Sequence, residues 1–500
     1  MKIAVEGCAH GELEKIYDTI KCLEERENIK VDLLLCCGDF QTSRNEEDLR
    51  CMAVPPKYYD LCSFYKYYSG EKIAPILTVL IGGNHEASNY LQELPYGGWV
   101  APRIYYMGYA GVINVGGVKI GGISGIYKKG DFMKGHFEIC PYDNSTKRSV
   151  YHIRNLEIFR LKQVTEPIDI FLSHDWPTNV TDYGNKEQLI RFKPHFKDDI
   201  EMRKLGSKPC EDLLNTLKPK YWFSAHLHCK FAALIPHQNE TVTKFLALDK
   251  CLPKRRFLQV FDVPHDENEE IKINYDLEWL TILMTTNHLL SVKPETNSMP
   301  GPYSDERNCF KPTEEEKNII LSKLSNNLTV PENFVQTMKP YDVNSSNKVQ
   351  LEQPGPLQNP QTTYLCKLLN IDDPIELILK NNDQNFSESN LSLKTNHSSS
   401  NVVNSDCDLE ETSDEPSFIN DTIVEDSPPQ TKRSILCLPE PKNDSNDLFF
   451  IDTEPSSCDN SWKRKSQESV DVKDEIVSCK PDQKKFKRRN FNIYGSGDNS

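Results

Sequence analysis

Residues 76–90 read ILTVLIGGNHEASNY, and this stretch decides the fold class. The mostly apolar run over 76–81 predicts a buried strand. Two glycines follow it, and then Asn84, His85 and Glu86. In α/β proteins, ligand sites lie at the carboxyl ends of such strands. The stretch therefore predicts an α/β protein with a ligand site at 82–86.

Strand-like and helix-like stretches alternate around this strand as far as about residue 250. Apolar residues with helical spacing predict a helix over 12–26. Further elements are predicted as strands at 2–5, 31–36, 168–172 and 221–224, and as a hairpin at 112–125 with Gly116-Gly117 at its turn. The order β-α-β-α-β, followed mainly by strands, predicts a layered α/β β-sandwich flanked by helices rather than one doubly wound sheet.

The pattern changes after residue 250. Residues 275–292 and 312–324 predict amphipathic helices, which pack on the first part of the chain or form a small domain. In 381–400, eleven of twenty residues are Asn or Ser, too polar to offset the entropy of ordering. We therefore expect a catalytic domain at 1–250, a small, mostly helical C-terminal domain at 251–380, and a disordered acidic tail with terminal basic clusters at 381–500.

The amino-acid composition limits the classes of protein to which the chain can belong. Hydrophobic residues make up 37% of the 500 residues, below the roughly 45–50% (Gly included) of average globular proteins. The formal charge of −15 means that any polyanion must meet a local basic patch. The 16 cysteines form no CxxC, and neither a secretory signal nor a membrane span is visible. We expect a soluble intracellular protein with reduced thiols.

Five segments carry metal-ligand side chains at or near the ends of predicted strands. They are GCAH (7–10), CCGDF (36–40), GGNHE (82–86), LSHDW (172–176) and SAHLH (224–228). Taken alone, a His after a strand is more often a structural residue, and an Asp after Gly is usually part of a turn. Together they place five of the 12 histidines at equivalent strand ends, where their side chains would converge in one pocket. Such a set of N, O and S donors suits two first-row divalent ions.

In this order the motifs resemble the calcineurin-like metallophosphoesterases, whose pattern is D-x-H, G-D, G-N-H-[ED], a His after a strand, and G-H-x-H. The resemblance covers 1–230 and departs at Cys8, where Asp is expected, and at Ala225, where Gly is expected. One branch of the family, the RNA lariat debranching enzymes, is resembled more closely and to about residue 380. The segments that carry this resemblance are GCAHGELEKIY, CCGDFQ, GGNHEASNY, NVGGVKIGGISGIY and PYDNSTKRSVYHIR.

The resemblance implies a role for each motif residue. Cys8, His10 and His228 would hold a first metal ion. Asn84, His174 and His226 would hold a second, with Asp39 bridging the two. His85 would face the substrate and transfer a proton. Two such ions can clamp a phosphate and lower the pKa of a shared water toward 7.

Cys8 has a second interpretation, as a small buried hydrophobic residue. As a thiolate ligand it would favour Zn²⁺ or Fe²⁺ over Mg²⁺. The resemblance implies one or two divalent ions per chain, Fe²⁺ or Zn²⁺, with Mn²⁺ able to substitute. Replacement of the family's carboxylate by Cys8 leaves open whether the first site is fully occupied.

Residues 124–154 interleave cations with aromatic rings, a composition typical of surfaces that bind unpaired RNA. A solvated loop with a few packed rings is the alternative. In the debranching enzymes the matching segment is the lariat recognition loop. The residues predicted to bind RNA are Tyr127, Lys128, Lys129, Phe132, Lys134, Tyr142, Lys147, Arg148, Tyr151 and Arg154.

The resemblance implies hydrolysis of the 2′,5′-phosphodiester at the branch point of excised intron lariats. The alternatives are a phosphatase or nuclease with another substrate, and a scaffold that keeps the fold without turnover. The expected partners are branched RNA and, through the tail, splicing-associated proteins. Basic clusters at 463–465 and 484–489 predict nuclear import. The oligomeric state does not follow from the sequence.

Overall fold

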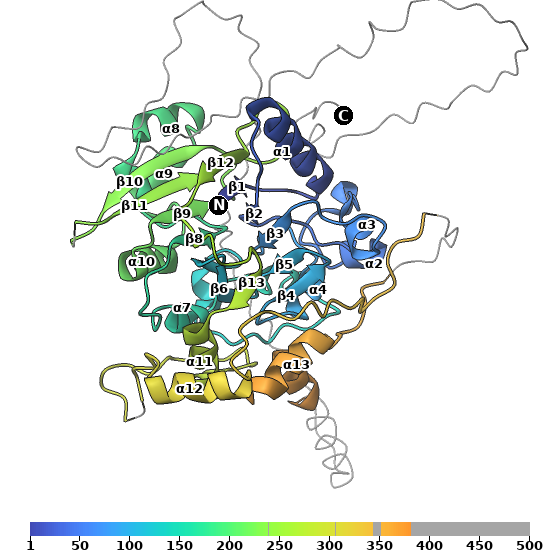
Figure 1. The fold of residues 1–500 in the computed structure, drawn as a ribbon, viewed down its shortest axis with the longest axis vertical. Helices are drawn as coiled ribbons and strands as arrows, with labels where there is room; N and C mark the ends of the chain where they lie inside the picture. The colour runs from blue at the N-terminus through green and yellow to red at the C-terminus, as the bar shows by residue number, and fades with distance from the viewer. Residues whose placement is uncertain (239, 306, 344–351, 382–500) are drawn as a thin grey trace, which may run out of the picture. The chain divides into compact units, whose positions relative to one another are not determined.

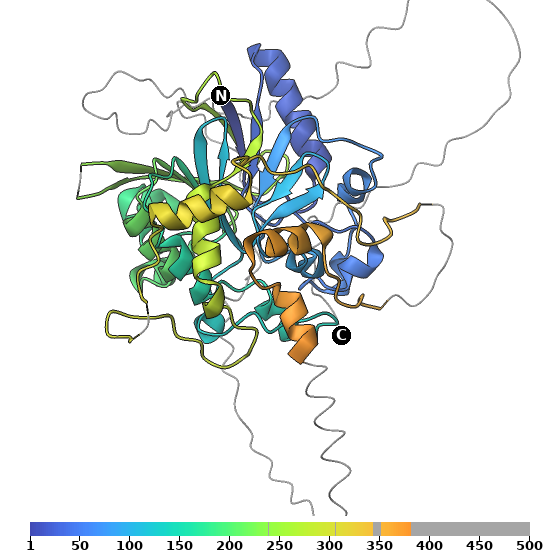
Figure 2. The same cartoon turned by 60° about the horizontal axis from the view of Figure 1, so that its bottom comes forward.

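Two β-sheets packed face to face form the centre of the protein, with helices on their outer faces (Figures 1 and 2). The computed structural model describes residues 1–381 apart from 239, 306 and 344–351. All but the first residue of the predicted tail, including both basic clusters, lies outside the described residues.

The first sheet has six strands, of which β1, β2, β3 and β5 are parallel neighbours and the two edge strands are antiparallel. In spatial order they are β12 (Leu258–Asp262), β1 (Lys2–Glu6), β2 (Leu33–Cys36), β3 (Leu77–Leu80), β5 (Ile104–Tyr106) and β4 (Gly98–Ala101). The strands β1, β2 and β3 are almost wholly buried, because apolar residues pack on both faces of the sheet.

The second sheet has seven strands, and its four parallel members are central. In spatial order they are β10 (Phe231–Pro236), β11 (Val242–Ala247), β9 (Tyr221–Ser224), β8 (Ile170–Ser173), β7 (Val118–Ile123), β6 (Ala110–Val115) and β13 (Ile273–Tyr275). Between the sheets, one apolar cluster combines residues of both, including Val5, Leu35 and Val79 from the first and Ile120, Leu172 and Phe223 from the second.

Helices form the outer layers. The α-helices of the described residues are α1 (Leu13–Glu27), α2 (Glu46–Leu49), α3 (Phe64–Tyr68), α4 (Ser88–Gln92), α5 (Lys129–Phe132), α6 (Thr146–Ser149), α7 (Asn155–Leu161), α8 (Lys186–Phe192), α9 (Phe196–Glu201), α10 (Lys208–Leu217), α11 (Leu277–Thr285), α12 (Glu314–Lys323) and α13 (Pro360–Leu369). Short 3₁₀ turns lie at Pro56–Tyr58, Val180–Tyr183 and Asn287–Leu289. Apolar residues of α1 and α3 cover the first sheet, and those of α7, α10 and α11 cover the second. No helix among the described residues is long and apolar enough to cross a membrane.

The predicted layered α/β sandwich is confirmed, and one predicted helix differs. The helix expected over 275–292 begins only at Leu277, where the Asp276 side chain accepts a hydrogen bond from the Trp279 N–H at 2.8 Å, and it ends at Thr285. It is not amphipathic, because residues 278–283 are all buried between β6 and α12. The helix expected over 312–324 forms as α12, with a capping box between Thr313 and Glu316.

The chain after residue 250 is built into both sheets. The strand β12 pairs with β1 at the edge of the first sheet, and β13 pairs with β6 at the edge of the second. Leu280, Ile320 and Leu365 belong to the same apolar cluster as residues of β7, β8 and β9. Of the two arrangements expected for this segment, the structure therefore shows the one in which it packs on the first part of the chain and shares its core.

Candidate active site

The five ligand-bearing segments meet where the parallel strands of both sheets end. β1, β2 and β3 lead to Cys8, Asp39 and Asn84, and β8 and β9 lead to His174 and His226. The carboxyl ends of parallel strands share one edge of a sheet, and the packing of the sheets brings the two edges together.

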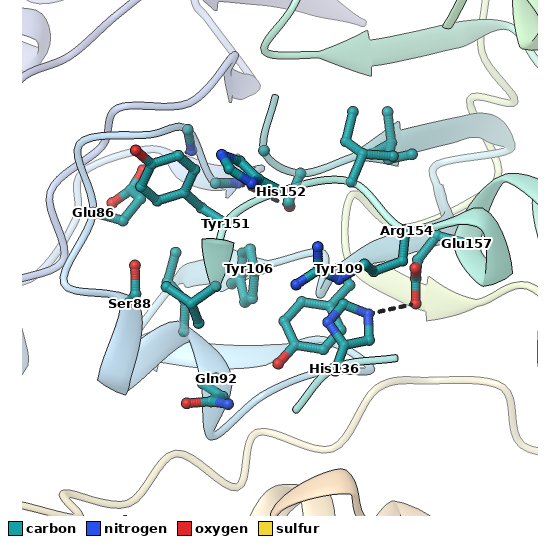
Figure 3. Close-up of a pocket in the computed structure, with 18 residues that line it drawn as sticks. Glu86, Ser88, Gln92, Tyr106, Tyr109, His136, Tyr151, His152, Arg154 and Glu157 are labelled. Atoms are coloured by element: carbon teal, nitrogen blue, oxygen red, sulfur yellow. Dashed lines mark hydrogen bonds and ion pairs between the residues drawn. The ribbon is translucent and has the colours of Figure 1, made fainter. Parts of the chain in front are cut away.

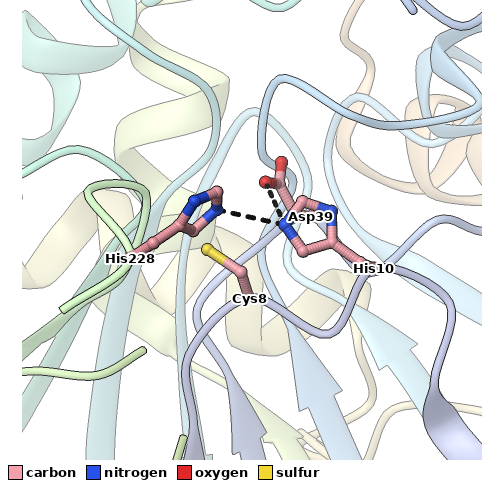
Figure 4. Close-up of side chains that lie close together, drawn as sticks. All are labelled: Cys8, His10, Asp39 and His228. Carbon is pink, nitrogen blue, oxygen red and sulfur yellow. Dashed lines mark hydrogen bonds and ion pairs between the residues drawn. The ribbon is translucent and has the colours of Figure 1, made fainter. Parts of the chain in front are cut away.

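One group of four side chains converges tightly, as Figure 4 shows. The ligand atoms of Cys8, His10, Asp39 and His228 all lie within 4.8 Å of one another. His10 Nε2 is 3.1 Å from His228 Nε2 and 3.6 Å from Asp39 Oδ2. Cys8 and Asp39 are buried, whereas the two histidines are partly exposed. These are the residues predicted for the first metal site.

The residues predicted for the second site meet on the other side of Asp39. His174 Nε2 lies 3.3 Å from Asp39 Oδ1 and 3.1 Å from the Asn84 side-chain oxygen. The His174 and His226 rings are 5.0 Å apart between centroids. Asp39 thus directs one carboxylate oxygen toward each group, which is the arrangement that a bridging ligand requires.

The electrostatics of the site favour cation binding. Burial would raise the pKa of Asp39, but the neighbouring His174 and His85 hold it well below its usual range. Burial lowers the pKa of His226 to about 3, and burial and His10 lower that of His228. Both imidazoles are therefore neutral at pH 7, the form in which histidine binds metals.

Asp39 also provides a direct test of whether the residues fit a metal ion. Its Oδ2 is buried and has no hydrogen-bond donor among the described residues, although a buried carboxylate oxygen normally has one. A Cβ on Gly83 would lie 2.3 Å from Asp39 Oδ1 and 2.8 Å from the His174 ring, so only glycine allows this approach. A charged, unsatisfied oxygen close to imidazoles and a thiol fits a divalent cation.

His85 also lies beside Asp39. Its side chain is 31% exposed, and its Nδ1 lies 3.3 Å from Asp39 Oδ2. Its backbone N–H donates to Asp39 Oδ1 at 2.9 Å. These contacts leave Nε2 as the ring atom available to a substrate, as expected for a residue that transfers a proton.

Glu86 is a positioning residue to which the sequence analysis gave no role. Its buried carboxylate accepts hydrogen bonds from the backbone N–H groups of Phe40 and Gln41 at 2.8 Å and of Gly83 at 3.1 Å. It thereby ties the loop that carries Asp39 to the loop that carries Asn84. Burial, reinforced by Asp39, raises the pKa of Glu86 to about 7. Its place in the GGNHE motif was the available signal.

The neck of the 124–154 loop lies directly beside the second group. Gly82 N–H donates to Ser124 Oγ at 2.9 Å, and Gly125 N–H donates to Gly82 O at 2.9 Å. A parallel bridge between Ile126 and His152 closes the neck. The loop therefore begins and ends next to the strand end that carries Asn84.

The predicted RNA-binding residues of the loop differ in exposure. Lys128, Lys129 and Arg148 are exposed, and five others are half-buried: Tyr127, Phe132, Lys134, Lys147 and Tyr151. Arg154 and Tyr142 are buried, where Arg154 pairs with Glu138 at 2.5 Å and Tyr142 donates to Gln92 Oε1 at 2.6 Å. In this structure these two stabilise the loop from within and present no surface to RNA.

A pocket lies between the loop and the strand ends, as Figure 3 shows. Gly83 and Glu86 line it on the side of the metal centre, and His136, Tyr151 and Arg154 line it from the loop. His136 stacks on Tyr109 with 4.1 Å between centroids and contacts Glu157 at 3.0 Å. The polar groups on this wall thus pair with one another and hold the loop in place.

Comparison with known proteins agrees with this geometry. The profile of the calcineurin-like phosphoesterases matches residues 1–230, and that of the lariat debranching enzyme C-terminal domain matches residues 240–374. Curated lariat debranching enzymes are similar to this chain. The protein from Drosophila melanogaster is 49% identical over 99% of both chains, and that from Drosophila pseudoobscura pseudoobscura is 48% identical over 100% of both. The Homo sapiens protein is 54% identical over 75% of this chain and 70% of its own. The phosphoesterase match and the buried Cys/His/Asp cluster together imply that the chain binds divalent metal.

Proposed function

The chain belongs to the lariat debranching enzyme family, and on that premise we propose that it hydrolyses the 2′,5′-phosphodiester at the branch point of excised intron lariats. The observation that carries the proposal is the convergence of ligands from five strand ends on Asp39, directly beside the neck of a basic and aromatic loop. The product is a linear RNA available for turnover.

The geometry supports two proposed ligand sets. Cys8, His10 and His228 would hold one ion, and Asn84, His174 and His226 would hold the other. Asp39 would be shared by the two sets, because its two oxygens face the two groups. The soft Cys8 sulfur among imidazoles favours Fe²⁺ or Zn²⁺, with Mn²⁺ able to substitute. Bound ions of this kind neutralise phosphate charge and activate water for attack.

His85 supplies the proton that the leaving group needs. Hydrolysis breaks the bond between phosphorus and the 2′-oxygen, and that oxygen leaves as a hydroxyl once it has gained a proton. With Nδ1 3.3 Å from Asp39 Oδ2, the His85 ring is oriented so that the proton is donated from Nε2. Asp39 therefore orients the acid as well as bridging the two ligand sets.

The 124–154 loop holds the RNA at the branch. Its exposed Lys128, Lys129 and Arg148 suit phosphates, and the partly exposed rings of Tyr127 and Tyr151 suit unpaired bases.

The sequence of the tail supports two further proposals. One is import into the nucleus through the basic clusters at 463–465 and 484–489, and the other is recruitment of splicing-associated proteins.

The decisive experiment incubates purified protein with a branched RNA and a linear 3′,5′-linked RNA of the same composition, with Fe²⁺, Zn²⁺, Mn²⁺ or Mg²⁺ added in turn. We expect cleavage only at the 2′,5′ linkage and no activity with chelator. Equal cleavage of both RNAs would favour a general nuclease. Bound metal without cleavage of either would favour a scaffold.

The His85→Ala variant tests the proton donor in the same assay. General acid catalysis is typically worth about 10²–10⁴-fold, so turnover should fall by that factor while the metal content stays at the wild-type level. Asp39→Ala, in contrast, should lose metal as well as rate. If His85→Ala loses metal in proportion to rate, His85 is a ligand and not the acid.

A further inference from the structure

The connector between β11 and β12, residues 248–257, carries a cluster of cations that the proposed mechanism does not use. Lys250, Lys254, Arg255 and Arg256 lie on it, and Asp249 is its only carboxylate. Lys254, Arg255 and Arg256 are exposed. Asp249 pairs with Arg255 at 3.3 Å, whereas Lys254 and Arg256 have no ion-pair partner in the described part of the chain. The connector therefore presents a net positive surface to solvent.

The connector is fixed against the first metal site. Lys250 forms a parallel β-bridge with Cys8, and the Cys251 N–H donates to Cys8 O at 3.0 Å. The Gly7 N–H donates to Phe257 O at 3.0 Å. Because both ends of the connector are hydrogen-bonded to the residues around Cys8, its exposed cations are held at the rim of the metal centre.

The sheet topology puts this surface and the 124–154 loop on opposite sides of the metal centre. In the first sheet β12 and β1 lie at one end of the ligand-bearing strands and β3 at the other. In the second sheet β11 and β9 lie on the same side as β12 and β1, and β7, which leads into the loop, lies beyond β8. The connector therefore flanks Cys8 and His228, and the loop flanks Asn84.

A branched RNA needs more than one such surface. Three strands leave the branch nucleotide, through its 5′, 3′ and 2′ oxygens, and one loop on one side of the centre cannot follow all of them. We propose that the exposed cations of the connector bind the sugar–phosphate backbone of a second RNA strand that leaves the branch on the side of Cys8 and His228. This inference rests on the proposed debranching activity.

The test pairs the double variant Lys254→Glu/Arg256→Glu with branched RNAs of different arm lengths. One substrate has single-nucleotide arms, and three others have one arm extended to about six nucleotides, within the usual footprint of single-strand surfaces. In the wild type, extending one particular arm should lower KM. At ~0.15 M salt the KM of the variant for that extended substrate should be about tenfold higher than the KM of the wild type. The slope of log affinity against log salt should fall by roughly 0.7 per lost phosphate contact.

Controls separate this surface from the catalytic site and from bulk charge. Lys311→Glu/Lys367→Glu makes the same charge change at two exposed lysines of the C-terminal helical part and should behave as the wild type. On the single-nucleotide substrate the connector variant should keep the wild-type kcat and KM. If charge reversal prevents folding, as judged by the thermal unfolding midpoint, Lys254→Gln/Arg256→Gln replaces it with about half the expected change in log affinity.

Three results would overturn the inference: wild-type affinity of the connector variant for every extended arm, an equal loss in the control variant, or an equal loss on the single-nucleotide substrate. Wild-type affinity for every extended arm would favour an acidic protein, and not RNA, as the partner of this surface. Failure of the wild type to cleave any branched substrate is a different outcome and overturns the proposed function. Direct binding of the extended RNAs would still report on the connector in that case.

Discussion

Asp39 and three of the histidines near it have backbone conformations that residues other than glycine rarely adopt. The φ angles are 46° at His10, 49° at Asp39, 63° at His226 and 51° at His228. Each such residue costs about 1–3 kcal/mol and persists only where surrounding contacts impose it. Here the tight turns aim these four donors at the two ligand groups, so the strain serves to arrange the ligands before an ion binds.

The proposed ligand role of Cys8 leads to a prediction about the metal preference of the first ligand set. Burial and the charge of Asp39 raise the pKa of the Cys8 thiol well above its ordinary value, so it becomes a thiolate only on giving its proton up to metal binding. Cys8→Asp should therefore shift the preference from Zn²⁺ or Fe²⁺ toward Mn²⁺ or Mg²⁺, and Cys8→Ser should bind worst. Metal titrations of the three proteins, alongside rates on branched RNA, check this. Identical preferences in all three would remove Cys8 from the ligands.

Glu6, at the end of β1, supports a prediction about stability and pH. Both of its carboxylate oxygens are buried and have no hydrogen-bond donor among the described residues. Burial and Asp39 raise its pKa well above the ordinary value. The unfolded chain loses this proton near pH 4.3 and the folded chain holds it to higher pH, so stability falls as pH rises between the two pKa values.

The variant Glu6→Gln should remove that loss. At pH 7 the free energy of unfolding of the metal-free variant should exceed that of the metal-free wild type. The difference should be about 1.4 kcal/mol for each pH unit between the unfolded pKa of Glu6 and either its folded pKa or pH 7, whichever is lower. At pH 4 the variant should gain nothing. Urea unfolding at both pH values measures this, and a gain of equal size at pH 4 would show that ionisation is not the cause.

Among the elements, the neck of the 124–154 loop connects the proposed RNA-binding loop to the strand end that carries Asn84. Gly125 has a φ of +89°, and a Cβ there would lie 1.9 Å from Tyr151 O. Gly125→Ala should therefore open the neck. The Tyr151 carbonyl is part of the backbone on the opposite side of the neck, so it can move away only if that backbone moves with it. We expect KM for branched RNA to rise about tenfold or more and the metal content to stay unchanged.

Gly130 provides a matched control within the same loop. A Cβ on Gly130 meets no atom within 4 Å, so Gly130→Ala should leave KM at the wild-type value. Hydrogen exchange of the neck amides, Ile126 and Ile153, should increase only in Gly125→Ala. Equal kinetics in the two variants would show that the neck does not position the loop.

In the whole molecule, the chain after residue 330 completes the catalytic fold. Gln361 accepts from the Trp99 N–H at 2.8 Å and donates to Trp99 O at 2.9 Å, extending the edge of the first sheet. Thr337 accepts from the buried Arg44 guanidinium at 2.8 Å and donates to Glu93 at 2.6 Å. Without these partners a buried ion pair would be left incompletely hydrogen-bonded, which is strongly destabilising.

Two truncations test this. A chain ending at residue 381 should fold and debranch RNA as the full chain does, because the residues beyond it have too little apolar content to join a core. A chain ending at residue 330 should be insoluble or should unfold at a much lower temperature. Nuclear accumulation should weaken in both. An inactive 1–381 chain, or a stable 1–330 chain, would contradict the assignment of the C-terminal segments.

Much of the site could be predicted from the sequence, because parallel strands of one sheet end at one edge. Apolar runs followed by donor residues therefore indicated which side chains would converge, and the division of these into seven ligands and the proton donor His85 is what the family resemblance implies. Local signals also identified α1, through its apolar spacing, and α12, through its capping residues. The layered α/β class followed from the order of these elements.

Only the tertiary structure decided features that depend on contacts distant in the chain. The sequence could not show that Arg154 is buried with Glu138, because a cation in a loop has the same local signature whether it faces solvent or a carboxylate. It could not reveal α11 as buried on every side, since that depends on β6 and α12 packing around it. The connector that carries the cations lies beside Cys8 because Lys250 forms a β-bridge with Cys8, a residue 242 positions away in the chain. Local patterns fix where a strand ends, whereas the packing of two sheets fixes what lies next to that end.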